Sequence, residues 1–231
     1  MSRKRKQNPK FQDERENKAQ PIVAKTIGQT NYIVALQRSV VVVATGSAGT
    51  GKTYVASAHA ANRLVRGEVD NVILSRPYVV MGKSCGLFPG TIYDKLEPFL
   101  KPMMNVFKTR LGENDYDSRV RAGKVTIQAL EAIRGMSFEN SILIIDEAQN
   151  TTPEDMKSIV TRIGENCQLI LCGDATQSDI RGPNGLDFIS NIIEDYQVAQ
   201  AEVVNFYPDD VVRSGITKRF VQIFDKLGGS K

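Results

Sequence analysis

The sequence contains few cysteines and no long apolar run. Its three cysteines among 231 residues, Cys85, Cys167 and Cys172, have no CxxC spacing, and their odd number argues against a disulfide framework or a zinc site. The longest apolar runs, such as residues 40–44 and 142–145, fall far short of the ~18 residues that a membrane span requires, and the first twenty residues lack an apolar signal-peptide core. We therefore expect reduced thiols and a cytoplasmic protein without membrane association.

Most of the chain has no excess of either charge. Residues 1–20 carry seven basic and three acidic side chains, which account for the whole formal net charge of +4 and leave 23 of each sign in the remaining 211 residues. This segment has almost nothing to bury, so we expect a disordered basic tail over residues 1–21 and a folded domain over residues 22–231. The tail either contacts nucleic-acid phosphates or only keeps the protein soluble.

Tryptophan is absent, and the seven tyrosines and nine phenylalanines are scattered along the chain. No motif interleaves aromatic with basic side chains, as a base-stacking surface for a single strand would. The sequence therefore indicates no preference between RNA and DNA.

Short apolar runs alternate with amphipathic stretches from residue 22 onward. Residues 39–45 are apolar or β-branched at nearly every position, which is typical of a strand buried on both faces. Strands that alternate with helices imply crossover connections, so the sequence predicts an α/β domain with a mostly parallel sheet covered by helices on both faces. We expect strands at residues 39–45, 71–75, 125–129, 142–146, 169–172 and 203–206, and helices at 52–66, 92–111 with a break near 98–102, 153–163, 185–195 and 209–227.

A complete G-x-x-x-x-G-K-T motif lies directly between the first predicted strand and a predicted helix. Such a loop turns consecutive backbone N–H groups toward phosphate oxygens, and the helix presents its positive N-terminus to the same anion. We expect Lys52 to reach the β- and γ-phosphates of ATP, and the Thr53 hydroxyl to ligate Mg²⁺. The loop residues that we expect to bind nucleotide are Gly46, Ser47, Ala48, Gly49, Thr50, Gly51, Lys52 and Thr53.

A second acidic site follows the apolar run at residues 142–145. Asp146 comes at the carboxyl end of this predicted central strand, where ligands bind in open α/β sheets, and it can hold Mg²⁺ through water. Glu147 is the next residue and is a candidate to orient or deprotonate the attacking water. The pair predicts a site that hydrolyses ATP instead of only binding it.

Two glutamines are further candidates. Gln177 follows the next strand in the segment Gly173–Gln177, and its amide is suited to sensing a γ-phosphate, although a strand-end turn capped by Asp174 is an equally simple reading. Gln29 lies 23 residues before Lys52 and could recognise the adenine edge with its amide, since one side donates and the other accepts; the alternative is a surface glutamine.

These motifs, in this order, resemble motifs I, II and III of superfamily 1 helicases, and further blocks narrow the resemblance to the PhoH-like ATPases. The resemblance covers roughly residues 26–226. It implies a RecA-like P-loop NTPase fold, ATP and Mg²⁺ as ligands, ATP hydrolysis and a hexamer. The further blocks are Arg76-Pro77, residues 86–90, Arg134-Gly135, residues 146–152, residues 161–164, residues 173–177 with Asp179, and residues 210–213.

Chain length bears on the mechanism. A superfamily 1 helicase binds ATP between two nucleotide-fold domains, whereas this sequence has length for one. We therefore expect a homo-oligomer, a ring in which each neighbour completes the ATP site with an arginine supplied in trans. Arg213 is the first candidate, followed by Arg76, Arg134 and Arg162, with an ordinary buried ion pair as the alternative for each.

The sequence thus predicts an ATP-hydrolysing motor domain that acts on single-stranded RNA or DNA. The main alternative is a nucleotide-dependent switch or assembly factor that hydrolyses ATP without unwinding a duplex. A protein that binds nucleotide without turnover is disfavoured by Glu147.

Overall fold

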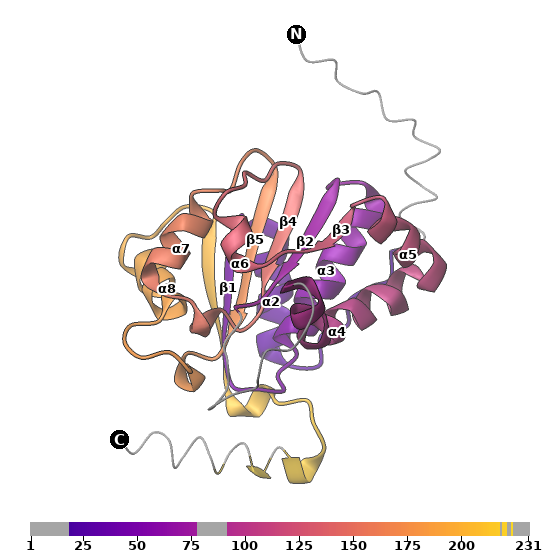
Figure 1. Cartoon of the computed structure of the whole chain (residues 1–231). Coiled ribbons are helices and arrows are strands. Elements are labelled where there is room, and N and C mark those ends of the chain that lie inside the picture. The colour runs from indigo at the N-terminus through magenta and orange to yellow at the C-terminus, as the bar shows by residue number, and fades with distance from the viewer. Residues whose placement is uncertain (1–18, 78–91, 218, 221–222, 224–231) are drawn as a thin grey trace.

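The computed structural model describes residues 19–77, 92–217, 219, 220 and 223 (Figure 1). Its centre is a six-stranded, all-parallel sheet with the strand order β3-β2-β4-β5-β1-β6. This confirms the predicted α/β class, and each strand lies within a few residues of its expected position. The strands are β1 (Val41–Gly46), β2 (Asn71–Ser75), β3 (Val125–Ile127), β4 (Ser141–Ile145), β5 (Cys167–Gly173) and β6 (Ala201–Phe206).

The central strands are buried on both faces, as their continuous apolar sequences require. All residues of β4 and β5 are buried. Successive side chains of β4 enter two different cores, with Ile142 and Ile144 in one and Leu143 and Ile145 in the other. This alternation follows from the two-residue period of a strand and builds two apolar layers from one run of sequence.

Helices cover both faces of the sheet (Figure 1). One core contains side chains from α2 (Ile27–Arg38), α3 (Lys52–Arg66), α4 (Ile92–Leu111) and α5 (Glu113–Arg121). The other contains side chains from α6 (Leu130–Ile133), α7 (Pro153–Val160) and α8 (Gly185–Asp195). Three short 3₁₀ turns, η1 (Ala148–Asn150), η2 (Ala175–Gln177) and η3 (Pro208–Asp210), follow β4, β5 and β6.

The expected break in the helix at residues 92–111 is wrong, because α4 continues through Pro98 and Pro102. Each internal proline costs about 3 kcal/mol. The helix nevertheless buries an apolar stripe with helical spacing, and each large apolar side chain buried contributes ~1.5–3 kcal/mol. The stripe consists of Leu96, Leu100, Met103 and Phe107.

The helix expected over residues 209–227 is wrong at its beginning. The chain forms η3 and then extended backbone, and helical residues begin at 215; residues 218, 221–222 and 224–231 lie outside the described part. The reason is tertiary, since the Asp210 carboxylate accepts hydrogen bonds from the backbone N–H of Gly28 at 3.0 Å and of Tyr207 at 3.0 Å. These bonds hold a turn where local sequence favours a helix.

The sequence pattern does not predict α2 or α5. The N-terminus of α2 is capped by Thr26, whose hydroxyl accepts from the N–H of Gln29. The expected disordered tail lies outside the described residues as far as position 18, and so do Cys85 and the predicted family block at residues 86–90. Cys167 and Cys172 are buried free thiols. In the described part of the chain, no helix has the length and apolar character to cross a membrane.

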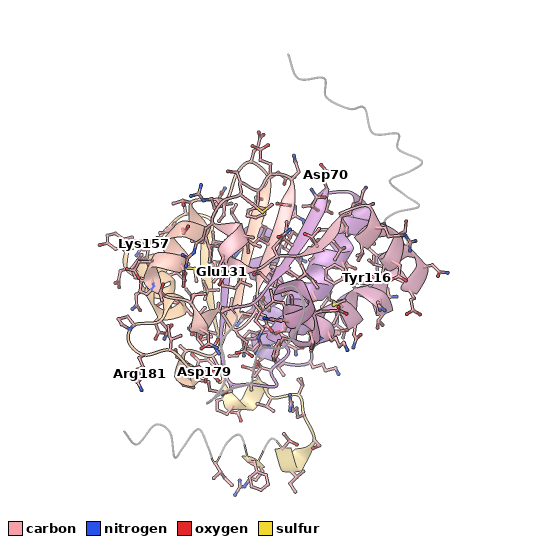
Figure 2. The ribbon with its side chains drawn as sticks, in the orientation of Figure 1. Asp70, Tyr116, Glu131, Lys157, Asp179 and Arg181 are labelled. Carbon is pink, nitrogen blue, oxygen red and sulfur yellow. The ribbon has the colours of Figure 1, made fainter. Side chains whose placement is uncertain are left out.

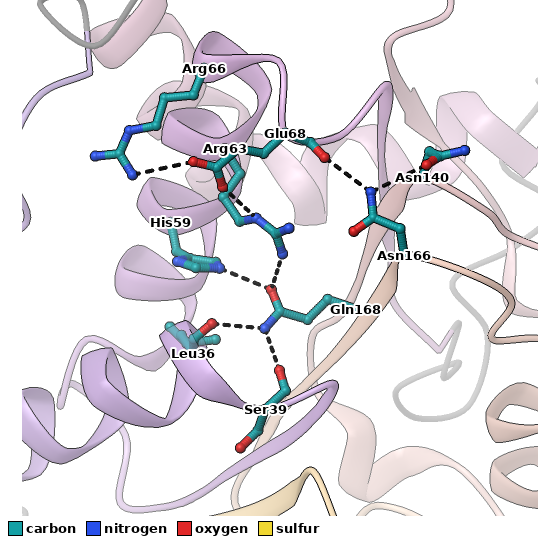
Figure 3. Close-up of polar contacts among 9 residues, drawn as sticks. All are labelled: Leu36, Ser39, His59, Arg63, Arg66, Glu68, Asn140, Asn166 and Gln168. Atoms are coloured by element: carbon teal, nitrogen blue, oxygen red, sulfur yellow. Dashed lines mark hydrogen bonds and ion pairs between the residues drawn. The ribbon is translucent and has the colours of Figure 1, made fainter. Parts of the chain in front are cut away.

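A polar network joins α2, α3 and β5 at the amino ends of the strands (Figure 3). The Gln168 amide donates to the carbonyl oxygens of Leu36 at 2.8 Å and Ser39 at 2.7 Å. Its Oε1 lies 2.9 Å from His59 Nε2 and accepts from Arg63 at 3.3 Å. His59 is 8% exposed, and burial lowers its pKa from 6.5 to about 4.

This pKa predicts acid destabilisation through His59. The folded-state pKa lies below the unfolded value, so the stabilisation is complete above pH 6.5 and is lost as the pH falls toward 4; the total is about 3 kcal/mol. The free energy of unfolding should therefore decrease more steeply between pH 6.5 and 4 in the wild type than in His59→Gln, as measured by urea denaturation at each pH. Parallel curves for the two proteins would contradict the assignment.

Candidate nucleotide-binding site

The phosphate loop joins β1 to α3 at the carboxyl edge of the sheet. Gly46 has φ 126°, and a Cβ at this position would lie 2.0 Å from the carbonyl oxygen of Phe206 on the neighbouring β6. Gly51 has φ 88° and forms the N-cap of α3. Only glycine fits both places readily, so the glycines of the motif allow the chain to turn from β1 into α3.

Lys52 is the first residue of α3, and its amine turns back into the loop. Nζ donates to the carbonyl oxygens of Gly46 at 2.6 Å and Ser47 at 2.9 Å, and the side chain is 8% exposed. Burial lowers the pKa of this amine, while the acidic groups around it, among them Asp174 and Asp146, oppose that shift. The amine is thus positioned on the loop that would hold a phosphate, with nearby carboxylates favouring its charged form.

Thr53 and Asp146 meet at the centre of the site. The Thr53 hydroxyl donates to Asp146 Oδ1 at 2.8 Å, although the two residues are 93 positions apart. Asp146 follows β4, and its N–H donates to the carbonyl oxygen of Ser75, which extends the sheet by one bond. A hydroxyl and a carboxylate oxygen are ligands that Mg²⁺ accepts, so Thr53 and Asp146 would hold this ion. Burial raises the pKa of Asp146.

Glu147 adopts a left-handed backbone conformation with φ 53°. Its Oε2 accepts from the Gln149 amide at 2.6 Å, and its Oε1 lies 3.6 Å from Arg76. Arg76 also lies 3.9 Å from Asp146 Oδ2. The second candidate for an arginine supplied in trans therefore contacts the acidic pair of its own chain.

Gln149 connects the carboxyl ends of β4 and β5, a role that the sequence does not predict. Besides donating to Glu147, its side chain accepts from the N–H of Asp174 at 3.2 Å through Oε1. Gly173 allows this approach, since a Cβ there would lie 2.4 Å from the same oxygen. The only sequence signal was that Gln149 belongs to the quoted block at residues 146–152.

Gln177 lies at the end of β5 as part of η2. Its amide donates to Asp174 Oδ2 at 2.8 Å, and Asp174 caps the turn by accepting from the N–H of Thr176 at 3.1 Å. The capped strand-end turn, left open by the sequence, is therefore present. Recognition of the γ-phosphate by Gln177 stays a prediction, and it requires the amide to leave Asp174.

The loops after β4 and β5 are also joined. Asn150 and Asp179 exchange two hydrogen bonds, of 3.2 Å and 2.8 Å. Asp179 and Arg181 lie below the sheet in the view of Figure 2, whereas Asp70, which precedes β2, lies near its upper edge. The motif residues thus gather at one edge of the sheet.

Gln29 is buried, so its interpretation as a surface glutamine is wrong. Its Nε2 donates to the carbonyl oxygen of Thr50 at 2.8 Å, and its Oε1 accepts from the N–H of Lys25 at 2.8 Å. A Cβ on Gly51 would lie 2.7 Å from the same Nε2. Gln29 therefore stabilises the phosphate loop through a hydrogen bond to its backbone. Contact of Gln29 with adenine stays a prediction.

Arg213 lies against the phosphate loop of its own chain. A Cβ on Gly49 would lie 2.9 Å from Arg213 Nε, and the N–H of Val212 donates to the Gly49 carbonyl oxygen at 3.1 Å. The other two arginine candidates are elsewhere: Arg134 forms an ion pair with Asp155, and Arg162 has a buried Nε without a hydrogen-bond partner. The geometry therefore places Arg213 beside the phosphate loop of its own chain, and its catalytic role stays a prediction.

Taken together, the parallel sheet, the glycine-rich loop and the Thr53–Asp146 pair define a P-loop NTPase domain of the RecA-like type. The family model described as "PhoH-like protein" matches residues 21–225. The chain belongs to this family.

Curated relatives agree with this assignment. Protein PhoH of Escherichia coli strain K12 is 37% identical over 211 residues, which cover 88% of this chain and 58% of that protein. A PhoH-like protein of Bacillus subtilis is 34% identical, over 90% of this chain and 66% of its own. The chain thus spans about 58–66% of the length of these relatives.

One solved structure supports the fold, and a second is a more distant likeness. The HK97 bacteriophage large terminase matches with a TM-score of 0.53 and 13% identity, covering 90% of this chain and 48% of the terminase. The Pif1 helicase from Candida albicans matches with a TM-score of 0.45 and 15% identity, covering 90% of this chain and 44% of the helicase.

Proposed function

We propose that this protein binds ATP with Mg²⁺ and hydrolyses it to ADP and phosphate. The observation that carries the proposal is the 2.8 Å hydrogen bond between Thr53 and Asp146, with Glu147 as the next residue. It joins the last residue of the phosphate-loop motif to an acidic strand end, so that a bound metal ion and the γ-phosphate would lie close to the candidate base.

Each side chain has a separate task in this proposal. Lys52 exchanges its loop carbonyls for phosphate oxygens and neutralises their charge. Thr53 and Asp146 would hold a Mg²⁺ ion, which would supply further positive charge to the phosphates. Glu147 orients or deprotonates the attacking water. Gln177 senses the γ-phosphate, and Arg213 stabilises the charge that develops on it.

We further propose that the ATPase is an oligomeric motor acting on single-stranded RNA or DNA. The order of the three motifs supports this, and so does the concentration of the net charge of +4 in residues 1–20. The resemblance to this family supports a homo-oligomer, a hexameric ring with shared sites. A switch or assembly factor with the same ATPase chemistry is the second candidate.

The ATPase rate with and without single-stranded RNA and DNA, at two salt concentrations, separates the candidates. A motor should show stimulation that falls as salt rises, because phosphate contacts release counterions. A switch should hydrolyse ATP at one rate in every mixture. Absence of hydrolysis under all conditions would contradict the proposed function itself.

Deleting residues 2–18 tests the tail as a nucleic-acid arm. The deletion ends at 18 because the carbonyl oxygen of Gln20 accepts from Asn62 at 2.7 Å and Arg110 at 2.8 Å, so residue 20 is part of the folded domain. The affinity for a single strand should show a flatter salt dependence, by about 0.7 in the log–log slope per lost contact. Basal ATPase should stay unchanged, and an unaltered slope would assign the tail to solubility.

A further inference from the structure

Arg76 spans the two acidic side chains of the site. It follows β2 directly, and Pro77 restricts its backbone to extended conformations, which fixes where the side chain starts. Nη1 lies 3.9 Å from Asp146 Oδ2 and Nη2 lies 3.6 Å from Glu147 Oε1. The guanidinium also lies over the Phe99 ring of α4, 5.3 Å from its centroid. Three elements of the fold therefore determine one side-chain position.

The two carboxylates, of Asp146 and Glu147, have the same arrangement of partners around their oxygens. One oxygen of each accepts a hydrogen bond from a neutral donor, Thr53 for Asp146 at 2.8 Å and Gln149 for Glu147 at 2.6 Å. A neutral donor thus fixes one oxygen of each carboxylate, and Arg76 faces the other oxygen of each.

We infer that Arg76 is a positioning residue that acts in cis, holding Glu147 toward the attacking water and screening it from Asp146. The inference rests on the proposed function. Two adjacent carboxylates repel each other, and a guanidinium between them offsets that repulsion. A planar, forked cation can span two separate carboxylates with two nitrogens, which an ammonium cannot do. This use of Arg76 removes it from the candidates for an arginine supplied to a neighbour.

The arrangement has opposite consequences for metal binding and for turnover. Arg76 places a positive charge close to an Asp146 oxygen that would also attract a divalent cation. Removal of Arg76 therefore strengthens binding of the cation. The same removal leaves Glu147 held by Gln149 alone, so turnover falls. A side chain that only supported folding would weaken both properties together.

The test compares Arg76→Gln, Arg76→Ala and Arg76→Lys. In Arg76→Ala, kcat should fall ten- to a hundredfold with KM for ATP changed less than threefold, and Arg76→Lys should recover part of kcat because it restores the charge without the fork. In parallel, the affinity of the ADP complex for Mn²⁺, measured from the electron paramagnetic resonance of free Mn²⁺, should rise about fivefold in Arg76→Ala and Arg76→Gln.

Arg119→Ala is the matched control. Arg119 has a similar exposure, 21% against 24% for Arg76, and forms an ion pair with Asp115 at 3.0 Å within α5. This control should change neither kcat nor Mn²⁺ affinity. Arg76→Gln keeps most of the stem and is the variant to use if Arg76→Ala does not fold.

Two results would overturn the inference. One is an unchanged kcat in folded Arg76→Ala or Arg76→Gln; the other is a joint loss of kcat and Mn²⁺ affinity. If the wild type hydrolyses no ATP, the proposed function fails, and the Mn²⁺ measurement still decides whether Arg76 opposes a cation at Asp146.

Discussion

Replacing Glu147 by glutamine should slow ATP hydrolysis by roughly a hundredfold or more and leave ATP affinity nearly unchanged. The substitution removes the base but keeps the shape, since a glutamine oxygen can still accept the bond that Gln149 donates to Glu147 at 2.6 Å. Lys52→Ala should instead lose binding and turnover together, because Lys52 neutralises the phosphates themselves. Nucleotide affinity measured beside the single-turnover rate distinguishes the two variants.

Glu131→Gln provides the control for the loss of a carboxylate. Glu131 is exposed on α6 and takes no part in the site (Figure 2). Its replacement should change neither affinity nor rate. Full turnover in Glu147→Gln would show that another residue activates the water, and the assignment of Glu147 would then be wrong.

Arg213→Ala should bind ATP and lose hydrolysis by about a thousandfold, the size of effect that arginines at transferred phosphoryl groups have elsewhere. The reason is that such an arginine stabilises charge that grows in the transition state. Its position against Gly49 makes its own site the nearest one. Nucleotide affinity and turnover, measured on the same preparation, check this.

Mixing subunits decides whether Arg213 acts within a chain or between chains. A Lys52→Ala subunit cannot bind ATP but still carries an intact Arg213, which it could offer to an Arg213→Ala neighbour. Because Arg213 contacts its own loop, we expect mixed assemblies to stay inactive. Recovery of ATPase from the two inactive proteins would show a shared arginine, whereas inactivity in proven mixed assemblies leaves Arg134 and Arg162 as candidates for a group in trans.

The central strands and the phosphate loop could be predicted from the sequence because each depends on residues that are neighbours in the chain. The continuous apolar run of β4 indicates a strand buried on both faces. The glycines before Lys52 have positive φ angles that other residues rarely adopt. The same reasoning failed for α4, where burial of the helix's own apolar stripe against the core overcame two prolines. It failed again at residues 209–214, where Asp210 bonds to Gly28 across 182 positions.

The sequence by itself determined the class of fold, the phosphate loop and the acidic pair at the end of β4. Each follows from a pattern in consecutive residues or in the succession of segments along the chain. Only the tertiary structure decided which side chains meet there. Parallel strands bring their carboxyl ends to one edge, and that edge puts Thr53 on Asp146, Arg76 on Glu147 and Arg213 on Gly49. These partners are separated by tens to more than a hundred positions, so no local pattern connects them, and the order of the strands together with the turns that follow them brings them together.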